Sequence, residues 1–210
     1  MLSVVTEVEV GDGRVFVRAI GLSFAYTDVR VFNSLNFSIK PGLTWIRGGA
    51  GRGKTALLNV IAGTHQPQSG TLQREQTPYF RTDLLAPDID HDSGRDWLKA
   101  CRAVIAPWDC ALESDLIDAF GLAEHIAKPI YMLSKGSWRK VGLVAAFACG
   151  ASVALLDTPF AALDAPSSRL LTELLEDAAQ HQSRAWVVAD FELPVGLEPW
   201  ARETIIELGD

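Results

Sequence analysis

A glycine-rich stretch decides the fold, and it reads Gly48-Gly49-Ala50-Gly51-Arg52-Gly53-Lys54-Thr55. It fits G-x-x-x-x-G-K-[ST], the pattern of a phosphate-binding loop, in which glycines let successive backbone N–H groups point at phosphate oxygens. Residues 43–47 before it are predicted to form a short buried strand, and residues 55–62 after it a helix. A chance match in a glycine-rich turn is the alternative, but the flanking strand and helix favour phosphate binding.

Two side chains of this loop are expected to carry chemistry. Lys54 is expected to reach the β- and γ-phosphates of ATP, and the Thr55 hydroxyl to bind Mg²⁺. The helix N-terminus adds partial positive charge at the phosphates. ATP and Mg²⁺ are therefore the predicted cofactors. The residues predicted to bind the nucleotide here are Gly48, Gly49, Ala50, Gly51, Arg52, Gly53, Lys54, Thr55 and Ala56.

Composition limits the classes of protein to consider. The 210 residues suit one domain, spanning 1–210, and the 48% of hydrophobic residues suit a real core. The net charge of −7 means that the chain as a whole lacks the excess of basic residues typical of proteins that bind nucleic acid or anionic lipid. Residues 1–10 lack the pattern of a signal peptide, and the longest apolar run, 141–156, is shorter than the ~20 residues that span a bilayer. We expect a soluble protein.

Cysteine usage points to a reducing compartment. Cys101, Cys110 and Cys149 are scattered, odd in number and form no C-x-x-C pair. All three are expected to be inert core residues.

Apolar strands alternating with helices predict a mostly parallel α/β sheet preceded by an antiparallel β layer. The layer is expected from β-type segments at 4–10, 14–20, 22–26 and 35–39. Further strands are expected at 71–73, 77–80, 153–156, 185–189 and 204–208. Residues 82–135 look like a helical insert, with helices at 95–105 and 112–120. A helix from Lys135 to about Cys149 and another that Asp164 caps complete the core.

The order of these features resembles the ATP-binding cassette (ABC) ATPases, from about Ile20 to Leu208. Residues 22–26 and 35–42 are similar to the N-terminal β layer of that family. Leu133-Ser134-Lys135-Gly136-Ser137 falls where the family has its L-S-G-G-Q signature. Val153-Ala154-Leu155-Leu156-Asp157 resembles the Walker B strand, and Ala161-Ala162-Leu163-Asp164 the D-loop. The implied fold is a P-loop NTPase of the ABC type.

The resemblance implies roles for residues outside the loop. Tyr26 would stack on adenine, with a core tyrosine as the alternative. Asp157 would hold Mg²⁺ through its water shell, with an ordinary strand-ending aspartate as the alternative. Ser134 and Gly136 would cap the γ-phosphate held by a second ABC domain. Lys135, which replaces a glycine, would either add a cation there or block close approach.

The chain departs from the family pattern at two catalytic positions. The glutamate that follows the Walker B aspartate is replaced by Thr158, which cannot act as a base near neutral pH. The switch histidine is replaced by Asp190, or by Ala189 if the alignment slips by one residue. The predicted catalytic set is therefore Lys54 and Asp157 with degenerate Thr158 and Asp190. The glutamine of the Q-loop is not found, since Gln76 precedes the relevant strand.

Two functions follow from these departures. The first is an ATP-binding subunit that couples ATP binding and hydrolysis to an integral membrane permease; the length and residues 191–195 most resemble the subunit of the cytochrome c biogenesis haem exporter. The second is a module gated by ATP binding with little hydrolysis, or the degenerate half of a heterodimer. Either implies a second ABC domain as partner and a cytoplasmic location on the inner membrane face. A small-molecule kinase fits less well, because residues 82–135 lack an arginine-rich lid.

Partner contact is expected on the helical insert, as the resemblance implies. Trp97, Trp108 and the apolar residues 105–107 are the candidate contacts. The alternative, favoured for each residue singly, is that they pack the core of the insert.

Overall fold

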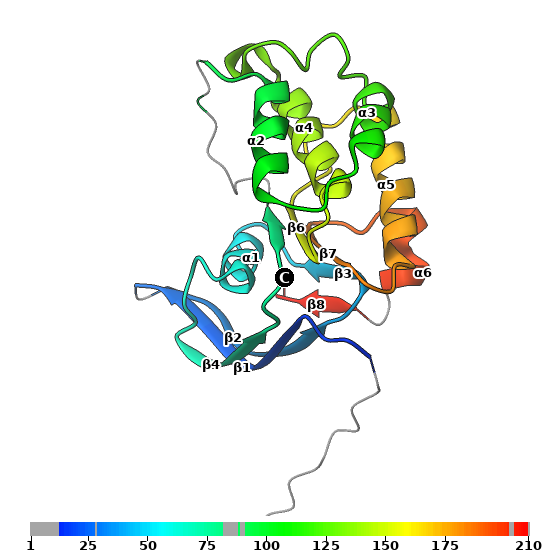
Figure 1. Ribbon diagram of the computed structural model, residues 1–210. Coiled ribbons are helices and arrows are strands. Elements are labelled where there is room, and N and C mark those ends of the chain that lie inside the picture. Colours follow the sequence, from blue (N-terminus) through cyan, green and yellow to red (C-terminus); the bar gives the residue numbers. More distant parts are fainter. Residues whose placement is uncertain (1–12, 28, 82–87, 89–90, 202–203, 210) are drawn as a thin grey trace, which may run out of the picture.

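The computed structural model describes residues 13–27, 29–81, 88, 91–201 and 204–209. Two sheets and a group of helices make up the molecule (Figure 1). The antiparallel sheet has the order β2-β1-β4, formed by β1 (Val17–Tyr26), β2 (Val29–Ile39) and β4 (Ser69–Arg74). The parallel sheet has the order β5-β6-β7-β3-β8, formed by β3 (Gly42–Arg47), β5 (Tyr79–Arg81), β6 (Val153–Asp157), β7 (Ala185–Asp190) and β8 (Ile205–Glu207).

The helices lie mostly on one side of the parallel sheet. In Figure 1, α2 to α5 gather in the upper half, whereas α1 lies between the parallel strands and the antiparallel sheet. Their bounds are α1 (Lys54–Ala62), α2 (Gly94–Val104), α3 (Cys110–Ala119), α4 (Lys135–Ala148), α5 (Ala165–Ala179) and α6 (Glu198–Ala201). Short 3-10 turns occupy Ile130–Met132 and Val195–Leu197.

The parallel strands are apolar on both faces, which gives the protein two cores. Along β6, Val153 and Leu155 pack with α1 and the antiparallel sheet, whereas Ala154 and Leu156 pack with the helices on the other face. This alternation follows from the two-residue period of a strand, and burial on both faces explains why these strands are continuous hydrophobic runs. The predicted helix and strand across residues 141–156 are confirmed as α4 and β6.

The antiparallel layer is present but differs from the prediction in three ways. One is that β2 begins at Val29, well before the expected strand at 35–39. The expected strands 14–20 and 22–26 are one strand, β1, because Gly21 (φ +61°) lies in a bulge rather than a turn. The strand β4, which follows α1 in the sequence, also joins this sheet by pairing with β1. The expected strand at 4–10 lies outside the described residues.

Side-chain caps start α2 and α5, and the sequence predicts the one at α5. Asp164 accepts a hydrogen bond from the Ser167 backbone N–H (2.8 Å) at the start of α5, as expected. Ser93 and Asp96 form a capping box at the start of α2. One prediction about the core is wrong: Cys101 and Cys149 are buried, but Cys110 is exposed because it opens α3.

Candidate functional site

The phosphate-binding loop joins the carboxyl end of β3 to the start of α1. Gly53 takes the N-cap position with φ +91°, and no side chain caps the helix. A Cβ atom at Gly53 would lie 2.1 Å from Cγ1 of Val31, so only glycine fits between the loop and β2. The first turn of α1 carries no acidic residue. The unpaired N–H groups and the helix dipole therefore offer a site for an anion.

Lys54 is held against the loop it belongs to. Its Nζ donates to the carbonyl oxygens of Gly48 (2.7 Å) and Gly49 (2.9 Å). These contacts fold the side chain back over the curled loop, so the ammonium lies against the first two residues of the loop. The position suits a cation that contacts the outer phosphates of a nucleotide.

Thr55, in α1, and Asp157, at the end of β6, place two side-chain oxygen atoms next to each other. The Thr55 hydroxyl donates to Oδ2 of Asp157 at 2.6 Å, linking the first turn of α1 to the end of β6. Hydroxyl and carboxylate oxygens suit Mg²⁺, which takes few protein ligands and keeps waters and phosphate oxygens in the rest of its shell. Within the described residues there is no group of three or more His, Cys, Asp or Glu side chains that could hold a metal by itself. The donor set thus fits Mg²⁺ bound together with a nucleotide.

A cleft of about 580 Å³ opens over the loop. Its size is in the range of small-molecule sites. Its lining combines apolar side chains with the loop, Thr55 and Asp157. The described residues that line it are Tyr26, Val29, Val31, Ala50, Gly51, Arg52, Gly53, Lys54, Thr55, Ala56, Asp157, Thr158 and Phe191.

Tyr26 is one of the apolar side chains that line this cleft. It is 46% exposed, so the alternative of a core tyrosine is wrong. The rings of Phe24 (4.8 Å between centroids) and His65 (5.7 Å) stand perpendicular to it and support it. Val29 pairs directly with Tyr26 across the β1–β2 hairpin and is 69% exposed. An exposed aromatic ring supported in this way suits stacking with a base.

The two catalytic departures lie side by side at the carboxyl ends of the neighbouring strands β6 and β7. The backbone N–H of Thr158 donates to the Ala189 carbonyl oxygen (2.8 Å), which places Thr158 next to Asp190. Thr158 has φ +45°, an unusual conformation for a β-branched residue. Burial raises the pKa of Asp190, and the charge of Asp157 adds to this rise, while Lys54 opposes it. Asp190 therefore lies within electrostatic reach of the phosphate site.

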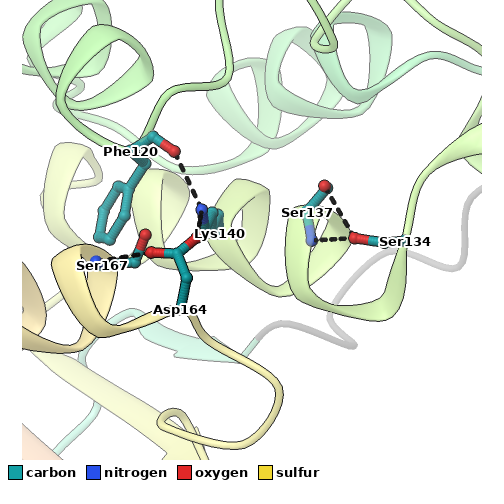
Figure 2. A network of polar contacts seen from close by, with 6 residues as sticks. All are labelled: Phe120, Ser134, Ser137, Lys140, Asp164 and Ser167. Atoms are coloured by element: carbon teal, nitrogen blue, oxygen red, sulfur yellow. Dashed lines mark hydrogen bonds and ion pairs between the residues drawn. The ribbon is translucent and has the colours of Figure 1, made fainter.

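The signature-like residues lie at the start of α4, away from this cleft. Ser134 is the N-cap: its Oγ accepts from the Ser137 backbone N–H (3.0 Å) and hydrogen-bonds the Ser137 hydroxyl (2.9 Å), as Figure 2 shows. A Cβ atom at Gly136 would lie 2.3 Å from the Ala162 carbonyl oxygen. Gly136 is therefore required for packing within the chain, a role that the sequence analysis missed. Among the described residues that line the cleft, none comes from this segment.

Other predicted residues have structural roles. Trp97 is 2% exposed and stacks edge-on with Trp138, so it packs the core as the alternative proposed. Trp108 packs against the same core and donates to Glu113 (2.6 Å). Gln76 is exposed outside any strand. Residues 82–87, where a Q-loop glutamine would fall, lie outside the described residues.

The sequence analysis missed three residues of the cleft: Val29, Val31 and Phe191. The only signal for the valines was their two-residue spacing just after Tyr26, which places them on one face of a strand. Phe191 gave the signal of an aromatic residue directly after a buried strand, and it is 57% exposed.

Comparison with known families decides the identity. The model of the family described as "ABC transporter" matches residues 32–161, well over half of the chain. The chain belongs to the ABC transporter family. Within this family it is an ATP-binding subunit, since the curated relatives it matches are ABC ATP-binding proteins.

Several ABC relatives resemble the chain at similar levels. The cytochrome c biogenesis ATP-binding export protein CcmA 1 of Cupriavidus metallidurans is 31% identical over 83% of this chain and 89% of its own length. The probable iron export ATP-binding protein FetA of Escherichia coli is 29% identical over 78% and 80%. The taurine import ATP-binding protein TauB of Sinorhizobium fredii is 29% identical over 75% and 64%.

Solved structures confirm the ABC ATPase fold. An ATP-binding subunit of an ABC transporter superposes with a TM-score of 0.70 at 19% identity, covering 89% of this chain and 83% of that one. The cbiO1 protein of Clostridium perfringens, part of the ABC transporter complex cbiONQ, gives 0.61 at 20% identity over 85% and 79%. In the part of the chain that the structure describes, no helix is both long enough and apolar enough to cross a membrane.

Proposed function

We propose that this ABC subunit binds Mg-ATP in the cleft over residues 48–55, pairs with a second ABC domain and transmits the closure of the pair to an integral membrane permease. The observation that carries the proposal is the contact of Thr55 with Asp157 (2.6 Å) beside the uncapped start of α1. Lys54 would contact the outer phosphates, and Tyr26 the base. Bound Mg²⁺ would be held by Thr55 and Asp157 and would neutralise charge on the phosphates.

A titration of the purified chain with ATP tests the binding. We expect a micromolar Kd with Mg²⁺, and weakening of at least about tenfold on Lys54→Ala, because a charge-assisted contact to phosphate is lost. Lys99→Ala is the matched control: it removes an exposed lysine of α2 outside the cleft and should leave the Kd unchanged. Equal affinity in the Lys54→Ala variant and the wild type would refute the proposed site.

A module gated by ATP binding with little hydrolysis is the second candidate, and Thr158 favours it. Phosphoryl transfer is catalysed mainly by positioning and charge stabilisation, so the loss of the glutamate slows turnover without necessarily abolishing it. Tight binding without turnover above that of Lys54→Ala would support the gated module. Turnover that Lys54→Ala removes would support the ATPase.

We propose that the transported substrate is haem, exported for cytochrome c biogenesis. The support is the relative named for cytochrome c biogenesis export, because its similarity to this chain extends over 89% of that relative's length. Relatives named for taurine import and probable iron export define the alternatives.

Deletion of this chain's gene in its host tests that assignment. We expect loss of covalently bound haem from c-type cytochromes, restored by the wild-type gene and not by Lys54→Ala. Growth on taurine and sensitivity to iron are measured in the same strains. A defect in either of these with normal cytochromes would refute the haem assignment.

A further inference from the structure

A groove follows the turn after β7, from α5 to the ends of β3 and β8. It consists of three hollows of about 450, 460 and 490 Å³ that have lining residues in common. Residues 191–193 line the first and the third hollow, and residues 194–195 line the second and the third. The hollows therefore form one continuous groove, which meets the nucleotide cleft at Thr158 and Phe191.

The groove is apolar along this turn. Val195 is 84% exposed, the highest value among the large apolar side chains that the structure describes. Phe191 is also exposed, whereas Leu193 and Phe160 are partly buried and pack against the core of the helices. A single exposed apolar side chain is ordinary, but this surface continues the core and stays open to water. Such a surface favours a partner that covers it.

Four glutamates, here called the rim glutamates, surround the apolar residues. They are Glu173, Glu176, Glu192 and Glu198. Within the described residues, their carboxylates take part in no ion pair or hydrogen bond. Asp190, the remaining carboxylate of the groove, accepts from the Phe191 backbone N–H (2.7 Å). Of the two arginines that line the groove, Arg47 is paired with Glu207, which leaves Arg169 to offset four negative charges. The groove therefore attracts cations.

We propose that this groove binds a basic amphipathic segment of a partner protein. The apolar side chains of the segment cover Phe191, Leu193 and Val195, and its lysines and arginines pair with the rim glutamates. The inference goes beyond the proposed function and does not depend on ATP binding, because none of the rim glutamates lines the nucleotide cleft.

The charge of the groove selects against other occupants. Nucleic acid and anionic lipid carry negative charge and would be repelled. A second copy of this chain in a two-fold contact would bring the same glutamates face to face, and the chain as a whole has a net charge of −7. A basic segment is the occupant that complements both the apolar residues and the rim.

Site-specific photo-cross-linking in the host tests the occupant. The full chain carries p-benzoylphenylalanine in place of Val195 or, as the matched control, in place of Val104, an exposed valine of α2 outside the groove. Mass spectrometry then identifies the cross-linked peptide. We expect position 195 to capture a segment of another protein that has an excess of lysine and arginine and periodic apolar residues. Position 104 should not capture that segment.

Several results of this experiment would overturn the inference. They are a cross-link from position 195 to this chain itself, to a lipid or to an acidic segment, the same segment captured from position 104, and no cross-link from position 195.

A titration then separates docking in the groove from general attraction to an acidic chain. The cross-linked segment is synthesised as a peptide and titrated against the purified full chain. Combining Glu192→Lys with Glu198→Lys should weaken the Kd at least about tenfold, because two ion pairs become repulsive contacts. Combining Asp115→Lys with Asp118→Lys makes the same change of charge at exposed positions of α3 and should alter the Kd less than about threefold.

Two further measurements complete the titration. The melting temperature checks that both double variants stay folded. The affinity of the wild type for the peptide should fall as salt rises, because salt screens exposed ion pairs. Equal weakening in the two double variants, or an affinity that does not change with salt, would refute the inference.

Discussion

At the scale of single residues, exposure separates the side chains proposed to contact the nucleotide from those that pack the core. Tyr26, Val29 and Phe191 are large apolar side chains left exposed around the phosphate-binding loop. Trp97, which is also a large apolar side chain, is buried. An isolated exposed apolar side chain is ordinary, but three around one cleft indicate a surface that a flat apolar group covers.

Replacement of Tyr26 tests this at the residue scale. Tyr26→Ala should weaken Mg-ATP binding by roughly 10-fold, since stacking of a base on an aromatic ring contributes about 1–3 kcal/mol. Tyr26→Phe should bind within about twofold of the wild type, and GTP should be affected as ATP is, because every base has a π-face. Calorimetric titration checks these values.

Tyr131→Ala is the control for that titration, because Tyr131 is also an exposed tyrosine and does not line the cleft. A similar loss of affinity in Tyr131→Ala, or none in Tyr26→Ala, would contradict the assignment of the base site.

At the scale of elements, one lysine of α4 connects three helices. Lys140 Nζ donates to Oδ2 of Asp164 (2.6 Å) at the start of α5 and to the Phe120 carbonyl oxygen (3.2 Å) at the end of α3, as Figure 2 shows. Its side chain is 13% exposed and that of Asp164 55%. The link joins the helix that begins with the signature-like residues to the end of α3 and the start of α5, so it holds these three helices together.

The Lys140 link predicts a pH-dependent contribution to stability. The hydrogen bond from Lys140, with a smaller contribution from Ser167, lowers the pKa of Asp164. A carboxylate whose pKa is lowered by folding stabilises the fold above its unfolded pKa and loses that contribution as pH falls toward the folded value. Lys140→Met should therefore lower the free energy of unfolding by about 1 kcal/mol at pH 7, and the difference should shrink below about pH 4.

Urea unfolding of both proteins across pH 2.5–8, a range chosen around the ~3.9 reference pKa of aspartate, measures that difference. Lys99→Met, at an exposed position of α2, controls for the loss of a positive charge. A difference between wild type and Lys140→Met that stays constant with pH would show that the pairing with Asp164 does not contribute.

At the scale of the whole molecule, the parallel sheet separates two cores with different tasks. Leu57 and Val187 belong to the core beneath the phosphate-binding loop, shared by α1 and the antiparallel sheet. Leu98 and Val188 belong to the core of the helices on the other face. The nucleotide cleft is supported by the first core, and the expected partner-facing helices by the second.

Cavities in the two cores should therefore have different effects on binding. Leu57→Ala and Leu98→Ala each remove a side chain that is at most 1% exposed, so each should cost about 2–5 kcal/mol of stability. Leu57→Ala should also weaken Mg-ATP binding, because α1 carries the loop residues Lys54 and Thr55. Leu98→Ala should leave the affinity within about threefold at temperatures where the protein stays folded. Equal losses of affinity would mean that the two cores do not act separately.

Much of the fold could be predicted because its signals are local. The strand, glycine loop and helix at residues 43–62, the buried strands β6 and β7, and the cap at Asp164 each follow from neighbouring residues. The bulge at Gly21 could not be predicted, since glycine signals a turn and a bulge alike and only pairing with β2 distinguishes them. The same holds for β4, whose place beside β1 depends on contacts distant in the sequence.

The sequence by itself determined which residues are predicted to bind phosphate, because residues 48–55 are neighbours in the chain and their spacing alone specifies a curled loop before a helix. It also determined the family, through motifs in a fixed order. Only the tertiary structure decided which side chains come together: Thr55 contacts Asp157, and Tyr26 lines the same cleft as the loop. The physical reason is that burial and hydrogen bonding depend on packing between segments far apart in the sequence, which no local pattern records.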